Sequence, residues 1–183
     1  MAELILETDR LILRTRDEAD MPVWLEHLNT PAVMKHLGGP QDIVEIESAF
    51  ARNAAWQAQH GHSFWIVQHK GNGDLIGMCG LKRFDNEHGS MAGEFEIGWR
   101  LREDYWRQGI AYEAASAALS YAFDRLDAPH VVALTSDANI GSWKVMEKLG
   151  MTRRADLDFD DPAYPAHENP TIVYRIEASQ WQA

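Results

Sequence analysis

One stretch of sequence decides the fold of this chain: Glu94-Phe-Glu-Ile-Gly-Trp-Arg-Leu101, continued by Arg102-Glu-Asp-Tyr-Trp-Arg-Gln-Gly109-Ile-Ala111. Apolar side chains occupy every second position over residues 95–101, which predicts a half-buried strand over 94–101. From Gly109 the small and apolar residues recur about every four positions, which predicts a helix over 109–126. A glycine turn at a helix N-terminus leaves backbone N–H groups unpaired, and the helix dipole favours negative charge there. The turn at Gly109 is therefore a candidate phosphate site.

The sequence argues against two common nucleotide ligands for this turn. It contains no Gly-x-x-x-x-Gly-Lys-Ser/Thr run, which would supply the lysine and the magnesium-binding hydroxyl of a nucleoside triphosphate site. It also contains no Gly-x-Gly-x-x-Gly dinucleotide motif. On the turn alone, an ordinary helix start without a ligand remains the alternative.

Three segments resemble the GNAT superfamily of acyl-CoA N-acyltransferases. Trp106 to Ala111 is similar to motif A of that family, with its fixed Gly109 and a small residue at Ala111. A tryptophan in place of the motif's leading Gln or Arg is typical of the RimJ/RimL-like branch, the ribosomal-protein N-terminal acetyltransferases. Asn139-Ile-Gly-Ser142-Trp-Lys-Val-Met-Glu-Lys-Leu-Gly150 resembles the Asn-x-x-Ser helix of that branch, and Thr8-Asp-Arg-Leu-Ile-Leu-Arg14 resembles its first strand.

The resemblance covers nearly the whole chain and implies its fold and its cofactor. We expect a single domain over residues 1–183 with a mixed α/β GNAT fold. The family's sheet has about seven mostly antiparallel strands with helices on both faces. Its fourth and fifth strands splay apart to admit the pantetheine arm of acetyl-CoA. The cofactor-binding positions implied in this chain are Trp99, Leu101, Arg107, Gln108, Gly109, Ile110, Ala111, Asn139 and Ser142.

Local patterns predict the other elements. Strands are expected over 11–16, 64–69, 75–84, 131–136, 151–157 and 171–176, and helices from Asp17 or Asp20 to about Asn29, over 43–60 and over 140–149. The early strands pair as neighbours and the later ones alternate with helices, which is typical of a mixed α/β layer arrangement. Residues 158–170 form an acidic, proline-bearing loop, which reads either as a solvated surface or as part of the acceptor cleft.

Glu96 and Ser142 are the candidate catalytic residues. Acyl transfer needs a neutral amine, so a carboxylate near the thioester is the general base that the reaction requires. The family often has a glutamate at the position of Glu96, and Glu94 on the same strand face is the reserve. Many GNAT enzymes protonate the leaving thiolate with a tyrosine seven residues after the asparagine, but that position holds Met146. The RimJ/RimL-like branch also lacks this tyrosine, and a serine at the position of Ser142 is its proposed replacement.

The composition limits the setting and the partners. The formal net charge of −11 argues against nucleic-acid binding, which needs a basic surface, and is compatible with a cationic amine substrate. No apolar run is long enough to span a membrane and no signal peptide is present, and the only cysteine is Cys79. A cytoplasmic protein without membrane contact is therefore expected. Metal-ligand spacing is lacking among the eight histidines, so no metal is expected. The oligomeric state is left open between monomer and homodimer.

The sequence thus predicts an acetyl-CoA-dependent N-acetyltransferase whose leading acceptor is the N-terminal α-amine of a protein. A small amine, such as a polyamine, an aminoglycoside or an amino acid, is the alternative acceptor. A non-catalytic acyl-CoA-binding module is the alternative from another class, because the tyrosine acid is absent. No covalent acyl-enzyme is expected, because no activated nucleophile is apparent.

Overall fold

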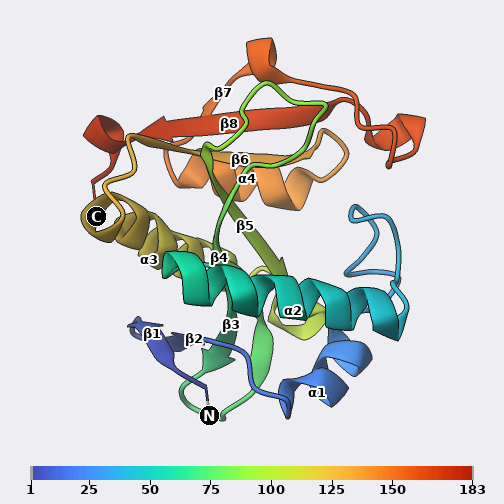
Figure 1. Cartoon of the computed structure of the whole chain (residues 1–183), viewed down its shortest axis with the longest axis vertical. Coiled ribbons are helices and arrows are strands. Elements are labelled where there is room, and N and C mark those ends of the chain that lie inside the picture. Colours follow the sequence, from blue (N-terminus) through green and yellow to red (C-terminus); the bar gives the residue numbers. More distant parts are fainter. Residues whose placement is uncertain (1, 183) are drawn as a thin grey trace.

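A computed structural model describes residues 2–182 of this chain. Within them, eight strands form one sheet in the order β1-β2-β3-β4-β5-β6-β8-β7, packed with four α-helices (Figure 1). The strands are β1 (Leu4–Glu7), β2 (Leu11–Arg14), β3 (Phe64–His69), β4 (Leu75–Arg83), β5 (Phe95–Leu101), β6 (His130–Ser136), β7 (Thr152–Arg153) and β8 (Thr171–Glu177). The helices are α1 (Asp20–His27), α2 (Ile43–His60), α3 (Ile110–Arg125) and α4 (Ile140–Lys148). The mixed α/β fold with a mostly antiparallel sheet is confirmed.

The sheet opens between β5 and β6. Every other neighbouring pair is antiparallel, whereas β5 and β6 run parallel and pair only at Phe95 with Val131 and Glu96 with Val132. In Figure 1, β5 runs diagonally away from β6 beyond this short contact. The splayed strands expected for the fold are therefore present, and the backbone edges of both strands are left without a partner strand along the gap.

Two clusters of buried side chains divide the helices between the faces of the sheet. Side chains of α3 and α4 pack with one face of β5, through Phe95, Ile97 and Leu101. Side chains of α1 and α2 pack with the opposite face of β3 and β4. Because successive side chains of a strand alternate between faces, Glu96 and Arg100 of β5 lie on the α1 and α2 side. The alternation that the sequence predicted for residues 94–101 thus separates an apolar face from a polar one.

The N-termini of the first two helices differ in how they are capped. The predicted helix over 43–60 is α2, which begins with a reciprocal capping box between Asp42 and Glu45. Helix α1 begins at Asp20, but neither Asp17 nor Asp20 caps it. Instead the Asp20 carboxylate accepts hydrogen bonds from both terminal nitrogens of Arg14 at 2.7 and 2.8 Å. The charge of Arg14 draws the carboxylate toward the sheet, and the helix end is left without a side-chain cap.

Two strand predictions differ from the structure. Strand β1 is additional to the seven expected, and its partly exposed, irregular pattern at the edge of the sheet gave no period-two signal. The strand expected over 151–157 is only Thr152–Arg153, followed by a 3-10 turn over Ala155–Leu157. In that segment Arg153 pairs with Asp158 and Arg154 with Asp156. These short-range ion pairs fold the chain back on itself where a longer strand would have kept it extended.

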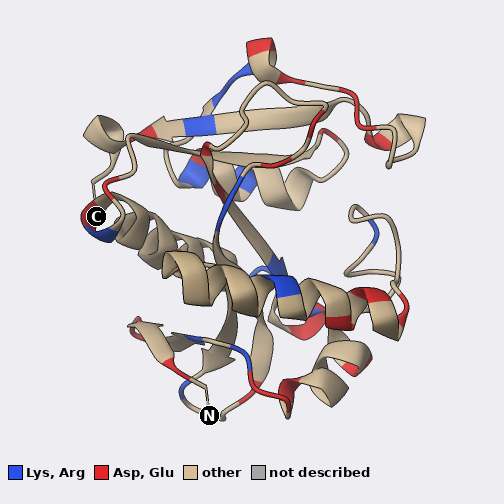
Figure 2. Cartoon of the chain, viewed as in Figure 1, with Lys and Arg blue, Asp and Glu red and all other residues tan. Residues whose placement is uncertain are grey.

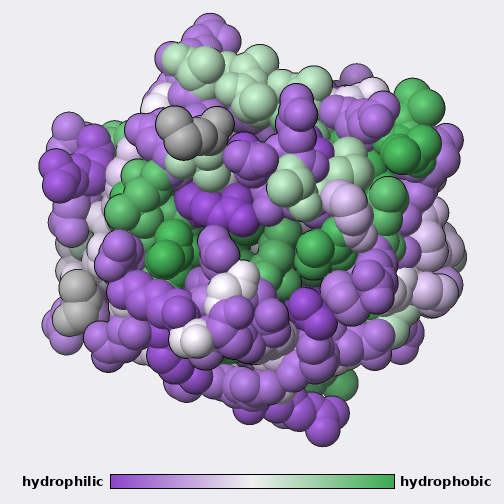
Figure 3. All heavy atoms as spheres, turned by 90° about the horizontal axis from the view of Figure 1, so that it is seen from below, coloured by the Kyte–Doolittle hydropathy of each residue, from purple (hydrophilic) through white to green (hydrophobic). Residues whose placement is uncertain are grey.

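The surface is acidic in many places. Asp and Glu residues occur in several separate parts of the fold, among them the first half of α2 and the loops beside β8 (Figure 2). Viewed from below, apolar residues come to the surface between predominantly hydrophilic ones (Figure 3). Among the described residues, the large apolar side chains that are exposed are Leu4, Ile43, Val44, Trp106 and Ile140. Among the described residues, no helix combines the length and the hydropathy that a membrane crossing requires.

Candidate active site

The turn before α3 presents a row of unpaired backbone donors. Gly109 is the N-cap residue of α3 and adopts a left-handed conformation with φ 78°. Within residues 2–182, the N–H groups from Arg107 to Tyr112 have no hydrogen-bond acceptor, and the first helical bond is from Glu113 N to Gly109 O. Arg107 also has a positive φ of 60°. Consecutive unpaired N–H groups at a helix N-terminus bind anions well, so the geometry supports the phosphate site expected here.

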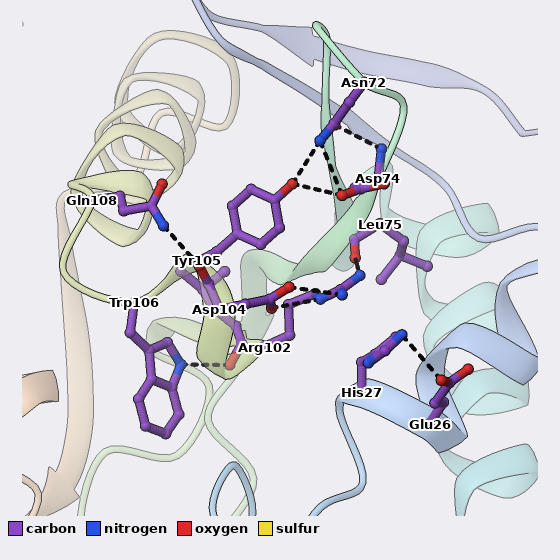
Figure 4. A network of polar contacts seen from close by, with 11 residues as sticks. Glu26, His27, Asn72, Asp74, Leu75, Arg102, Asp104, Tyr105, Trp106 and Gln108 are labelled. Carbon is purple, nitrogen blue, oxygen red and sulfur yellow. Dashed lines mark hydrogen bonds and ion pairs between the residues drawn. The ribbon is translucent and has the colours of Figure 1, made fainter.

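Side chains of the preceding segment hold this turn in place (Figure 4). Arg102 makes two hydrogen bonds with the Asp104 carboxylate at 2.7 and 2.8 Å. Gln108 Nε2 donates to Asp104 O at 2.7 Å, and Tyr105 Oη donates to Asp74 Oδ2 at 2.7 Å. The Gln108 side chain therefore stabilises the turn, and only its backbone N–H is available to a cofactor.

Arg10 anchors the turn from the other side, and the sequence gave no sign of this role. Its Nη1 donates to the carbonyl of Gln108 at 3.0 Å, and its Nε lies 2.6 Å from Oε2 of Glu113. Thr8 Oγ1 also donates to Glu113, at 2.5 Å. These contacts tie the turn between β1 and β2 to the start of α3. They hold the turn before α3 in place and leave its backbone N–H groups available to a ligand.

An open groove leads away from Gly109 along α3, with a volume of about 570 Å³. It runs past Tyr112 and Ser116 toward Lys148 of α4. The Lys148 Nζ lies 4.3 Å from the centre of the Tyr112 ring. This groove offers a cation and an aromatic face beside the phosphate turn.

Backbone groups of Trp99 and Leu101 face the gap between β5 and β6. In an antiparallel pair, alternate residues direct both backbone groups to the same neighbour. Arg102 N donates to Ile76 O at 2.9 Å, so the even-numbered residues of β5 bond to β4 and the odd-numbered ones face the gap. The Leu101 carbonyl is already used, because it accepts a hydrogen bond from Trp106 Nε1 at 2.7 Å. Trp99 therefore offers both backbone groups to a ligand in the gap, and Leu101 offers its N–H.

Three other predicted cofactor residues differ in how they are placed. The Ile110 side chain is buried in the core against the sheet, so its N–H alone faces the turn. Ala111 is partly buried against the same core. Arg107 is exposed, and its side chain has no partner among the described residues. The predicted cationic contact from Arg107 is therefore compatible with the structure.

Asn139 and Ser142 lie at the start of α4, on the α3 side of the gap. Asn139 is the N-cap residue, but its side chain does not cap the helix. In the described chain, neither the Asn139 amide nor the Ser142 hydroxyl makes a hydrogen bond, and both residues are partly buried. Their polar groups therefore remain available to a ligand. Met146, at the position of the family's tyrosine, is buried with 1% of its surface exposed.

Glu96 lies on the opposite face, beside Lys82 of β4. The Lys82 Nζ is 3.5 Å from Glu96 Oε2, and the Glu96 side chain is 15% exposed. Burial raises the pKa of Glu96, and the positive charge of Lys82 opposes this effect only in part. A carboxylate with a raised pKa is a better proton acceptor than an ordinary one. Glu96, at the last paired position of β5 and β6, and Ser142, at the start of α4, thus lie on opposite faces of the sheet.

Glu94, the reserve base, is held elsewhere. Its Oε2 lies 2.8 Å from His130 Nε2, at the start of β6, and 4.0 Å from Arg175 Nη1. Glu94 precedes β5 at the end where β5 and β6 are paired. These contacts favour a structural role for Glu94 and leave Glu96 nearer to the opening.

In the loop over residues 158–170, Tyr164 is a partly buried residue that the sequence did not single out. Burial raises the pKa of Tyr164, and the neighbouring charges that act on it include Asp161, Arg100 and Glu96. Buried carboxylates of the loop bond to other parts of the fold, since Asp161 accepts from Asn86 Nδ2 at 2.7 Å. Glu168 is 5% exposed and accepts a hydrogen bond from Ser136 at the end of β6.

The other reactive groups give no sign of chemistry. Cys79 is buried in the core, and burial raises the pKa of its thiol, so the thiolate nucleophile is disfavoured. In the part of the chain that the structure describes, no three His, Cys, Asp or Glu side chains are grouped so as to hold a metal ion.

Comparisons with known proteins show the family to which this chain belongs. Residues 10–152 match the family model described as acetyltransferase (GNAT) domain. The uncharacterized N-acetyltransferase YnaD of Bacillus subtilis (strain 168) is 29% identical over 148 residues, which are 81% of this chain and 82% of YnaD. An acetyltransferase structure from Agrobacterium tumefaciens str. C58 has a TM-score of 0.76 and 30% identity, and the match covers 94% of this chain and 93% of that one.

RimL, a ribosomal L7/L12 alpha-N-protein acetyltransferase, has a similar structure with a TM-score of 0.78, over 97% of this chain and 95% of its own. At 17% identity this match shows a shared fold alone.

Proposed function

This chain is an acetyl-CoA-dependent N-acetyltransferase of the acetyltransferase (GNAT) family, and from that premise we propose that it acetylates the N-terminal α-amine of a protein by direct attack in a ternary complex. The observation that carries the proposed site is the row of unpaired N–H groups from Arg107 to Tyr112, beside the gap between β5 and β6. The pyrophosphate of acetyl-CoA fits the row of N–H groups, and its pantetheine arm fits the gap between the two strands. The Asn139 amide and the backbone of Trp99 line the same route.

Glu96 accepts the proton of the attacking amine. The amine nitrogen attacks the thioester carbonyl carbon, the new C–N bond forms, the C–S bond breaks, and the thiolate of coenzyme A leaves. An ammonium cannot attack, so a base is needed near neutral pH, and Glu96 is the partly buried carboxylate on the acceptor face. Holding both reactants in one gap supplies proximity, and N–H groups of β5 that face the gap polarise the carbonyl.

Ser142 stabilises the leaving thiolate in this proposal. Its hydroxyl is uncommitted in the described structure and lies in the first turn of α4. Because Met146 has no proton to donate, the tyrosine mechanism of other family members does not apply here.

A screen of thiol release tests this function. The protein is mixed with acetyl-CoA and with peptides of varied N-terminal residue, polyamines, aminoglycosides and amino acids, and the free thiol of coenzyme A is measured. Release with peptides and little release with the small amines supports the proposal. Release with a small amine alone makes that amine class the acceptor. Tight binding of acetyl-CoA without release from any amine would identify a binding module.

A further inference from the structure

Arg100 is a mostly buried arginine without a carboxylate partner. Six of the eleven other arginines pair with carboxylates in this acidic protein, and among the described residues Arg16 is the other arginine whose Nε is buried without an acceptor; the six are Arg10, Arg14, Arg102, Arg153, Arg154 and Arg175. Within residues 2–182, the Arg100 side chain makes no ion pair and no hydrogen bond, and its Nε is sealed from solvent without an acceptor. An unpaired buried charge is costly to keep, so a protein retains one mainly where something else neutralises it.

The terminal nitrogens of Arg100 remain accessible. Among the Arg100 nitrogens, Nε alone is both buried and unpartnered, so Nη1 and Nη2 keep contact with solvent. The guanidinium lies 5.4 Å from the centre of the Trp24 ring, and Trp24 in turn packs edge-on against Phe50. The Trp24 ring thus lies beside the guanidinium, whose two terminal donors keep contact with solvent. This is the arrangement in which arginine receives a carboxylate or a phosphate through two parallel hydrogen bonds.

The position of Arg100 on β5 places its guanidinium on the proposed acceptor side of the site. Arg100 and Glu96 share the face of β5 that lies opposite α3, whereas the phosphate turn opens into α3. Tyr164 lies within the electrostatic influence of both residues. Burial lowers the pKa of Arg100 to about 10, which still leaves the guanidinium charged near neutral pH.

We propose that Arg100 binds an acidic group, a carboxylate or a phosphate, carried by the amine acceptor. This inference rests on the proposed function, because it takes Glu96 as the place where the amine reacts. Glu96 and Arg100 are four positions apart along a strand, so their Cα atoms are about 13 Å apart. An extended peptide covers this distance in fewer than four residues, so the acid belongs on the second or third residue of the peptide, counting the residue with the reacting amine as the first. Polyamines and aminoglycosides would place a second cation beside Arg100, which disfavours them.

The test compares matched acceptors on the full-length protein. Tripeptide amides with Asp, Asn or phosphoserine at the second or third position are assayed for thiol release, with spermidine as the cationic probe. We expect the acidic peptides to have the highest kcat/KM. Comparison of the Asp peptides with the phosphoserine peptides then shows whether the site prefers a carboxylate or a phosphate.

The variants are Arg100→Met, Arg100→Lys and the control Arg52→Met, which removes an exposed arginine of α2. Arg100→Met should lower kcat/KM for acidic peptides roughly 10- to 100-fold, mainly by raising KM. The kcat/KM for the Asn peptides and the KM of acetyl-CoA should not change. Arg100→Lys should retain part of the preference, and Arg52→Met all of it. Equal losses with acidic and neutral peptides, or a raised KM for acetyl-CoA, would overturn the proposal.

A second measurement does not depend on turnover. With coenzyme A present, an acidic peptide should raise the melting temperature of the wild type but not of Arg100→Met, provided that both proteins melt cooperatively without peptide. Equal shifts with Asp and Asn peptides in the wild type would contradict anion recognition, even if acetyl transfer occurs. Selective stabilisation by acidic peptides without thiol release would instead support the anion site and contradict the proposed catalysis.

Discussion

Lys82 Nζ lies 3.5 Å from Glu96 Oε2, across the antiparallel pair of β4 and β5 in which these two residues are direct partners. The lysine stabilises the ionised carboxylate, while burial favours the protonated one, and burial is the larger effect on the pKa of Glu96. The Lys82 ammonium also lies 3.2 Å from Asp85 Oδ1, so two carboxylates share its charge. The proton affinity of the proposed base is therefore set by a balance that single substitutions can shift.

Glu96→Gln keeps the shape of the side chain and removes the proton acceptor. The rate should fall roughly 10²-fold or more near neutral pH, while the affinity for acetyl-CoA changes little. Raising the pH should recover part of the loss, because more of the amine is then neutral. Steady-state kinetics over a pH series, together with calorimetry of acetyl-CoA binding, checks both points. A rate at pH 7 close to that of the wild type would exclude Glu96 as the base.

The pH profile of the wild type should show Glu96 directly. A base works when ionised, so kcat/KM should fall as the pH drops through the pKa of Glu96, which lies above its ordinary value of 4.5. Lys82→Met removes a charge that lowers this pKa, so the fall of kcat/KM on the acid side of the profile (the acid limb) should move to higher pH. Lys82→Arg keeps the charge and should move it little. An acid limb at the same pH in Lys82→Met and the wild type would show that the lysine does not tune the base.

Gly109→Val should weaken acetyl-CoA binding by about 2 kcal/mol or more, because the side chain strains the turn and holds phosphate oxygens away from the N–H groups. Gly61→Val is a matched control, since Gly61 has a φ of +73° close to the +78° of Gly109 and lies at the C-terminus of α2. Calorimetry on the folded variants should show weaker binding for Gly109→Val alone. Equal losses in both variants would indicate general strain, and unchanged affinity would remove the turn from the cofactor site.

Ser142→Ala should slow turnover about 5- to 150-fold, which corresponds to roughly 1–3 kcal/mol for one lost hydrogen-bond donor. The loss stays moderate because a thiol with a pKa of about 8.5 leaves readily as a thiolate. Ser142→Thr keeps the hydroxyl and serves as the comparison. Full activity of Ser142→Ala with unchanged binding of acetyl-CoA would reduce the serine to a part of the helix turn.

Glu168→Gln should destabilise the fold near neutral pH by about 1–3 kcal/mol. Burial by itself would raise the pKa of Glu168, but hydrogen bonds from Ser136 and His36 outweigh it and lower the pKa below 4.5. A lowered pKa means that the stabilisation is present above the unfolded value and is lost as the pH falls through the folded one. The difference between wild type and variant in urea unfolding should therefore shrink below pH 4.5. A difference that stays constant at acid pH would show that the Glu168 charge contributes nothing.

The sequence by itself determined the features that depend on neighbouring residues. The alternation over residues 95–101, the helix over 43–60 and the glycine turn before α3 are all local patterns, because a strand repeats every two residues and a helix every 3.6. The motif around Gly109 likewise places its N–H donors within one turn of chain. The family and the fold followed from such patterns taken in order.

Only the tertiary structure decided which distant side chains meet. Arg10 reaches the Gln108 carbonyl across 98 positions of sequence, and His36 reaches Glu168 across 132. Arg100 looks like any other arginine in the sequence, and its lack of a partner appears only when every nearby carboxylate has been placed. Such pairings depend on strand register and on burial, and both arise from packing of the whole chain. The sequence therefore specified the glycine turn before α3, and the folded structure specified the electrostatics of the sheet face that carries Glu96 and Arg100.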